Sequence, residues 1–390
     1  MWRLDSGTAQ DATLLLGAVA QAFARYDVPL ATRLARAALD AGGGFDAAEL
    51  LATILMFADR PDEAIRVLDA VAGEIDCDRR RSRWLTVRGM VSYWGLSRES
   101  TVEEIAQAGA ALTDPGDQAR VRAFEAIMRL HGLDGNEALR LARSVLDRPA
   151  ASVAARELAR CTIAHLDAAR GQFRNSATAI ARVAAEAPHW RSDMPYLQLA
   201  MELARGTRLA LAGDLAGIDA IVADEFADLA GAGDFRLGTG YLAILQAYAA
   251  RLRGRSGEAL KVSLGACAVL ATSRVYAGLA QAERAQAAAL RGEAEHAAEA
   301  MAEADRTHAP RHGGALPLAG AGPRGGAGGR GRPAGSHQAP QRPGRPAPRR
   351  RLRRARGARP ARPGPARAGS GPGRPDLHRR QPAYRGATAG

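Results

Sequence analysis

Residues able to carry catalysis are scattered along this 390-residue chain and form no recognisable constellation. The single lysine, Lys261, lies in GEALKV inside an expected helix and lacks the preceding glycine of a phosphate-binding GxxxxGK[ST] loop. GxGxxG occurs at 320–325 and 326–331, but no expected strand precedes either copy, so we assign both to chance. HExxH and GxSxG are absent. The sequence therefore predicts a non-enzyme with no catalytic, cofactor-binding or metal-binding residues and no cofactor.

Cysteine and histidine do not cluster in the sequence either. Cys77, Cys161 and Cys267 are far apart and form no CxxC pair, which favours small buried hydrophobes in a reducing cytosol over metal or redox chemistry. We expect the histidines before position 307 to lie singly, at the surface or at helix ends. They are His131, His165, His189 and His296.

A helical hairpin is clearest between Phe45 and Ile75, where two apolar helices flank a break at 59–61. Apolar residues of the first helix recur at spacings of three and four, and Asp46 and Glu49 occupy its first turn, where the helix dipole favours negative charge. Pro61 suits the first position of the second helix, which needs no N–H donor. The expected buried stripe of that helix is Ala64, Ile65, Leu68 and Val71.

Similar hairpins recur on both sides of this one. The first has its break at 26–29, and its Ala31 aligns with Ala64 at an offset of 33. A third runs from about Arg79 to Leu112, where we expect Trp84 and Trp94 to fill the core. Later breaks fall at glycines separated by 39, 42, 41 and 38 residues, and we expect each to have a positive φ at a helix C-terminus. These glycines are Gly132, Gly171, Gly213, Gly254 and Gly292.

Paired helices with a period of 33 to 42 residues are typical of a tetratricopeptide-like solenoid. A single hairpin cannot bury its apolar surface alone, whereas stacked hairpins share a continuous core. We therefore predict an all-α fold in which residues 1–306 form an α-solenoid of antiparallel helix pairs.

The charge of the chain is concentrated after this repeat region. The overall net charge is +13, but positions 307–390 hold 19 Arg and one acid, Asp376, for a net of +18. The region 1–306 carries 35 basic and 40 acidic residues, a net of −5, and shows no electrostatic footprint for nucleic acid. Because Gly, Ala, Pro and Arg dominate 307–390, we expect a disordered C-terminal tail.

Two origins of the tail stay open. PRGGAGGRGR at 323–332 and RRRLRRAR at 349–356 fit an arginine-rich arm that holds nucleic acid through phosphates. Only Tyr384 is available for base stacking, however. The same composition results when a GC-rich coding region is translated out of frame, and we favour this frameshift because the repeat has no capping unit.

Nothing in the sequence predicts a membrane segment. No apolar run approaches the roughly eighteen residues needed to span a bilayer. The apolar run at 14–24 follows Asp5 and Asp11, where a signal peptide would be positively charged. We expect a cytoplasmic protein without a membrane partner.

The repeat region resembles a known family. DVPLATRLARAALDAGGGFDAAELLATILMFADRPDEAIRVLDAV, with the later RLRGRSGEAL and ALRGEAEHAAEAM, looks like the helical-repeat region of large actinobacterial LuxR-type transcriptional regulators. It is similar in architecture to the sensor region of the maltose-system activator. In that family an ATP-binding domain precedes the repeats and a helix-turn-helix domain follows them. Neither pattern occurs here, so the resemblance, which covers 1–306, implies a fragment lacking the ATPase and helix-turn-helix domains.

Two classes of function follow. The resemblance implies a non-catalytic signal-sensing or protein-interaction region of a transcriptional regulator. Its groove would hold a protein partner or a small-molecule effector. DNA would be bound only through the missing domains, or non-specifically through the basic tail. The alternative is a free-standing tetratricopeptide-like scaffold that binds a peptide or protein in its concave groove.

Overall fold

The structure is a computed structural model that describes residues 11–132, 134–230, 235–271 and 276–307, without the side chains of 225–230. These residues form helices joined by turns, with no strand among them, which confirms the expected all-α class. Backbone contacts divide the chain into Met1–Gly325 and Gly326–Gly390, and every described residue belongs to the first unit. The predicted tail lies outside the described residues from position 308 onward.

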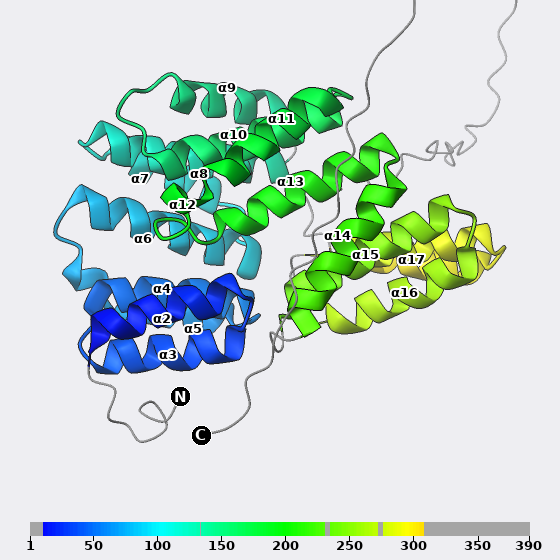
Figure 1. Ribbon diagram of the computed structural model, residues 1–390, viewed down its shortest axis with the longest axis horizontal. Coiled ribbons are helices and arrows are strands. Elements are labelled where there is room, and N and C mark those ends of the chain that lie inside the picture. Colours follow the sequence, from blue (N-terminus) through cyan, green and yellow to red (C-terminus); the bar gives the residue numbers. More distant parts are fainter. Residues whose placement is uncertain (1–10, 133, 231–234, 272–275, 308–390) are drawn as a thin grey trace, which may run out of the picture. The chain divides into compact units, whose positions relative to one another are not determined.

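The helices alternate between two series (Figure 1). The first helices of the pairs are α2 (Ala12–Ala24), α4 (Gly44–Phe57), α6 (Asp78–Met90), α8 (Pro115–His131), α10 (Val153–Ala169), α13 (Leu197–Ala212), α15 (Arg236–Leu252) and α17 (Ala277–Leu290). The second helices are α3 (Val28–Asp40), α5 (Pro61–Ala70), α7 (Thr101–Ala110), α9 (Gly135–Leu146), α11 (Phe173–Ala185), α14 (Leu215–Ala230), α16 (Ser256–Val269) and α18 (Ala294–Thr307). Shorter elements are a 3-10 turn (Ala72–Glu74), a π-helical turn (Val91–Gly95) and α12 (Ala187–Trp190).

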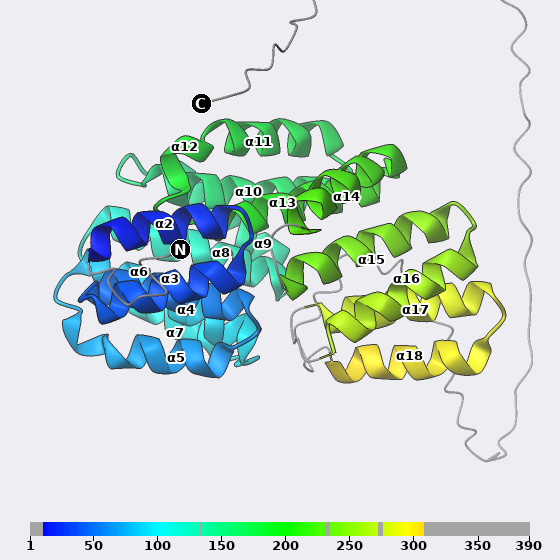
Figure 2. The same ribbon diagram turned by 60° about the horizontal axis from the view of Figure 1, so that its bottom comes forward.

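Each first helix contacts the second helix of its own pair and the first helix of the next pair. Figure 2 shows this order most plainly in α15 to α18. The sequence of each series explains its place. In α4 the buried residues surround the helix axis, whereas α5 buries only the narrow stripe of Ala64 and Leu68. First helices are therefore covered on several sides, and second helices on one.

The hairpin predicted at 45–75 is confirmed. Pro61 opens α5, and Leu68 is fully buried, while Ile65 is only half-buried. The predicted role of the tryptophans is confirmed too, since both are half-buried and packed against the core. The indole N–H of Trp84 donates to the carbonyl of Leu68 at 3.1 Å, which joins the second and third pairs. Trp94 lies in the π-helical turn after α6.

The breaks between paired helices have a common backbone conformation. The later breaks use glycines with φ between 68° and 79°, as predicted: Gly171, Gly213, Gly254 and Gly292. The prediction is wrong for Gly132, whose φ is −78°. In the first two pairs, the left-handed position of the break is occupied by Tyr26 (φ 59°) and Asp59 (φ 58°), which lie 33 residues apart. A left-handed residue is thus required at most breaks, and L side chains adopt it at some energetic cost.

Candidate functional site

A cavity of about 680 Å³ lies between the first helices of the first three pairs and a later part of the chain. One side is formed by α2, α4 and the start of α6. The other side is formed by residues 191–199, between α12 and α13, and by Phe235 just before α15. Its volume falls within the range of small-molecule sites, which is about 300–1,000 Å³.

One wall of the cavity is aromatic. Phe235 stacks on Tyr26 with ring centroids 5.2 Å apart and an interplanar angle of 7°. It also meets the edge of Phe57 at 6.1 Å, and Phe57 contacts Phe23 at 5.4 Å. Each such ring pair contributes about 0.5–1.5 kcal/mol beyond its buried area. The cluster therefore joins the first two helix pairs to the start of α15.

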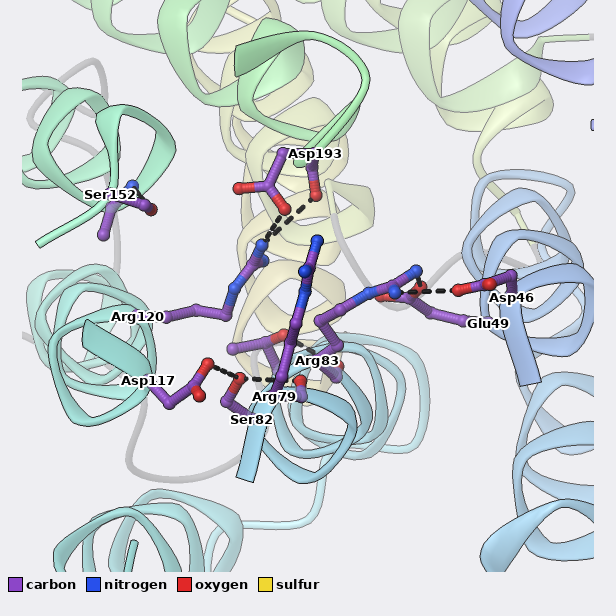
Figure 3. A network of polar contacts seen from close by, with 11 residues as sticks. Asp46, Glu49, Arg79, Ser82, Arg83, Asp117, Arg120, Ser152 and Asp193 are labelled. Carbon is purple, nitrogen blue, oxygen red and sulfur yellow. Dashed lines mark hydrogen bonds and ion pairs between the residues drawn. The ribbon is translucent and has the colours of Figure 1, made fainter. Parts of the chain in front are cut away.

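The opposite wall is built on Arg83 of α6. Its guanidinium donates to Asp46 Oδ1 at 2.7 Å and also bonds Glu49 Oε2, so one side chain holds two carboxylates of α4 (Figure 3). The planar fork of arginine suits this double contact, which the point charge of a lysine does not provide. Arg83 also lies over the ring of Phe45, 5.4 Å from its centroid. α4 and α6 are thus fixed together beside the cavity.

A second ion pair holds the 191–199 segment in place. Arg120 of α8 is 6% exposed and bonds the carboxylate of Asp193, which lines the cavity (Figure 3). Lower on the same face, Ser82 donates to Asp117 Oδ1 at 2.7 Å and links α6 to α8. Of these four residues, Asp193 lines the cavity, and its position is fixed by Arg120.

Two further arginines line the cavity without a carboxylate partner in the described part of the chain. Arg79, in the first turn of α6, points between Arg83 and Arg120 in Figure 3, and no hydrogen bond or ion pair is drawn from its guanidinium. Arg191 donates only to the amide oxygen of Gln198, at 3.3 Å, and lies 5.9 Å from the ring centroid of Trp190. Both side chains are solvent-exposed.

The electrostatics of the charged wall follow from burial. Burial raises the pKa of Glu49 above its ordinary value, although Arg83 opposes the shift. Burial likewise raises the pKa of Tyr196, on the same lining, to about 12. Each carboxylate of the lining is bound to an arginine, so the wall offers hydrogen-bond donors and apolar surface rather than a free base.

The predicted isolation of the histidines is wrong for two of them. His131 ends α8 and His165 lies within α10, and their ring centroids are 6.3 Å apart. His165 Nε2 lies 3.0 Å from the hydroxyl oxygen of Thr207 on α13. Burial lowers the pKa of His131, and it lowers the pKa of His165 to about 3. His189 and His296 are exposed, as expected.

The cysteine prediction holds only in part. Cys161 is buried and Cys267 half-buried, and burial raises the pKa of both thiols. Cys77 is exposed, contrary to expectation, because it precedes α6 in the turn that leaves the second pair. Within the described ranges, no three His, Cys, Asp or Glu residues are arranged to hold a metal ion.

No family model, curated protein or solved structure matches this chain. The resemblance to LuxR-type regulators therefore stays a prediction from the sequence. In the part of the chain that the structure describes, no helix combines the length and the apolar character needed to cross a membrane.

Proposed function

We propose that residues 1–306 form a tetratricopeptide-like α-solenoid of antiparallel helix pairs that recognises a ligand in the cavity between α2, α4, α6 and residues 191–199. In this proposal the region is the non-catalytic, signal-sensing and protein-interaction part of a LuxR-family transcriptional regulator that works in the cytoplasm. The repeated contact of each first helix with the next one supports the solenoid. The cavity supports the sensing role.

The single observation that carries the proposal is the form of this cavity. It has the volume of a small-molecule site, an aromatic wall and a charged wall, and both walls combine residues from distant helix pairs. Binding there would stabilise the contacts between these pairs, because a ligand that binds only the folded arrangement shifts the equilibrium toward it. A signal can be transmitted along stacked repeats in this way.

The cavity favours a small-molecule effector over the alternative of an extended peptide. The Tyr26–Phe235 stack and the Arg120–Asp193 ion pair each hold a segment of the lining against a part of the chain that is distant in sequence. The space between these segments has the volume of a small-molecule site, whereas a peptide scaffold uses an extended groove. The peptide-binding scaffold therefore remains the second candidate.

The test is a thermal-shift screen of the full chain against small molecules extracted from the source cells. The matched variant is Ala20→Trp, because Ala20 is an exposed residue of α2 that lines the cavity. We expect at least one compound to raise the Tm of the wild type and not that of the variant, whose indole fills the site. Equal shifts in both proteins would contradict the proposed site.

The regulator assignment is tested separately. Genomic sequence beside the gene should encode a nucleotide-binding domain before the repeats and a helix-turn-helix domain after them. The chain itself should neither hydrolyse ATP nor select a promoter sequence in gel-shift assays at physiological salt. Sequence-selective retention by residues 1–306 would overturn the assignment, because selection needs base contacts or selective deformation rather than charge alone.

A further inference from the structure

We infer that the cavity is a receptor for an amphipathic organic anion, a small molecule with a carboxylate, phosphate or sulfonate group at one end and an apolar or aromatic body at the other. Arg79 would bind the anionic group, with Arg191 beside it, and the aromatic wall would hold the body. This inference rests on the proposed function, since it names the class of ligand for the same cavity.

The first argument is the balance of charge around the cavity. Its carboxylates belong to Asp46, Glu49 and Asp193, and every one is already bound to Arg83 or Arg120. The lining carries three arginines, Arg79, Arg83 and Arg191, against these three carboxylates. Arg79 and Arg191 are the charged groups that have no oppositely charged partner in the described part of the chain. The wall is therefore complementary to an anion, and a cationic ligand would find no free carboxylate.

The second argument is the position of the unpaired cation. Arg79 extends between Arg83 and Arg120, whose own guanidiniums are engaged (Figure 3). Because carboxylates neutralise Arg83 and Arg120, the guanidinium of Arg79 is the group of this set with which a bound anion would pair. A planar guanidinium also offers two parallel N–H donors, the geometry that carboxylate, phosphate and sulfonate oxygens accept.

The third argument is the apolar surface opposite. Phe23, Tyr26, Phe57 and Phe235 form a continuous aromatic cluster on the lining, and Leu16 and Leu199 extend it. Phe57 and Phe235 are already buried, so the apolar surface left open to a ligand is the half-buried part of the lining, which is Leu16, Phe23, Tyr26 and Leu199. A ligand with an apolar body would cover it, and apolar burial is the main source of affinity in such sites.

The test uses two fluorescent probes that share one ring system. 8-Anilinonaphthalene-1-sulfonate carries a sulfonate, and N-phenyl-1-naphthylamine is its uncharged counterpart. Both are titrated into the full chain at physiological salt. Five proteins are compared, namely the wild type, Arg79→Gln, Arg79→Lys, Arg66→Gln and Ala20→Trp. The arginine-rich tail is present in all of them and cannot cause a difference between them.

Arg66 is the matched control because it is exposed on α5, lies off the cavity lining and forms no ion pair in the described structure. We expect Arg79→Gln to weaken sulfonate binding roughly tenfold or more, the loss typical of a hydrogen bond to a charged group. Arg79→Lys should lose less affinity for the sulfonate probe, because it keeps the positive charge. The uncharged probe should bind equally to both Arg79 variants, and Arg66→Gln should match the wild type with both probes. Ala20→Trp should bind neither.

The outcomes separate this inference from the proposed function. In one outcome, Arg79→Gln binds the sulfonate within about twofold of the wild type, while Ala20→Trp binds neither probe. This result overturns the anion receptor and leaves a ligand-binding cavity. Undiminished binding of both probes to Ala20→Trp overturns the cavity as the site and the proposed function with it. Circular dichroism and thermal melting of each variant establish that it is folded.

Discussion

His165 should make the fold sensitive to mild acid. The ring is 5% exposed in the middle of α10 and lies beside Thr207 of α13. Burial lowers its pKa from an ordinary value of 6.5 to about 3, and the neighbouring His131 acts in the same direction. The folded protein therefore holds the imidazole neutral at pH values where the unfolded chain would protonate it.

The sign and size of the effect follow from proton linkage. As the pH falls below 6.5, the unfolded chain binds a proton at position 165 that the folded chain does not, so stability decreases until the pH approaches the folded pKa of about 3. Each pH unit in that interval costs about 1.4 kcal/mol. At pH 5.0 the loss from His165 alone should be about 2 kcal/mol, and at pH 7.5 it should be close to zero.

Buried carboxylic acids change stability in the opposite direction, so their contribution must be removed by comparison with a variant. Burial raises the pKa of Glu157 and of Glu202, so stability rises as the pH falls through their folded pKa values toward the ordinary ones. Comparing the wild type with His165→Asn removes their contribution, because both proteins retain them. Asparagine keeps a polar group near Thr207 and does not titrate.

The assay is urea unfolding followed by far-ultraviolet circular dichroism at pH 7.5 and 5.0. Between these pH values the wild type should lose about 2 kcal/mol more unfolding free energy than His165→Asn. His296→Asn, on the exposed face of α18, is the control and should behave as the wild type. Losses that agree within about 0.5 kcal/mol in wild type and His165→Asn would refute the burial of a neutral imidazole at this position.

Three other predictions concern packing and can be measured by denaturant unfolding at pH 7.5. Leu68→Ala should cost about 2–5 kcal/mol, because the fully buried side chain leaves a cavity; a cost below about 0.5 kcal/mol would mean that Leu68 is exposed. Gly213→Ala should destabilise the fold by about 1–2 kcal/mol, because φ at this position is +68°. Gly265→Ala should stabilise the fold by about 0.5–1 kcal/mol, because Gly265 lies inside α16 and nothing lies within 4 Å of the new methyl group. The same sign for both would contradict the backbone assignment. Arg251→Met should cost about 3–5 kcal/mol, because it leaves Glu283 buried and unpaired. Burial raises the pKa of Glu283, so part of the loss should be recovered as the pH is lowered and protonation removes the unpaired charge. An equal loss at pH 7.5 and pH 5.0 would show that Glu283 reaches solvent.

Local features of the fold were predictable because they depend on neighbouring residues. The start of α5 at Pro61 and the positive φ of Gly213 follow from the conformations that proline and glycine allow. The same reasoning gives the wrong φ for Gly132. It caps α8 with φ −78°, and a C-terminal turn of that kind can be formed by any residue. A glycine at the expected spacing therefore does not by itself establish a left-handed turn.

The histidine pair was missed because its formation depends on helix register. His131 directly precedes its break glycine, whereas His165 lies six residues before Gly171, so the two do not occupy equivalent repeat positions. They meet because α8 and α10 cross with a particular offset. That offset is set by the packing of all the side chains between the two helices, and no short motif encodes it.

The cavity was not predicted for a related reason: amino-acid composition does not show which contacts the individual side chains make. The sequence contains 53 arginines and one lysine, and that count does not show which arginines are placed for a particular contact. In the folded chain, Arg83 bonds two carboxylates at once, and Arg120 fixes the segment that faces it. Arg83 uses one nitrogen for each carboxylate, whereas a lysine at position 83 would have a single nitrogen for both. The walls of the cavity thus depend on guanidinium geometry, whatever the origin of the arginines. The contact of Tyr26 with Phe235 depends on the summed rotation of the helix pairs between them.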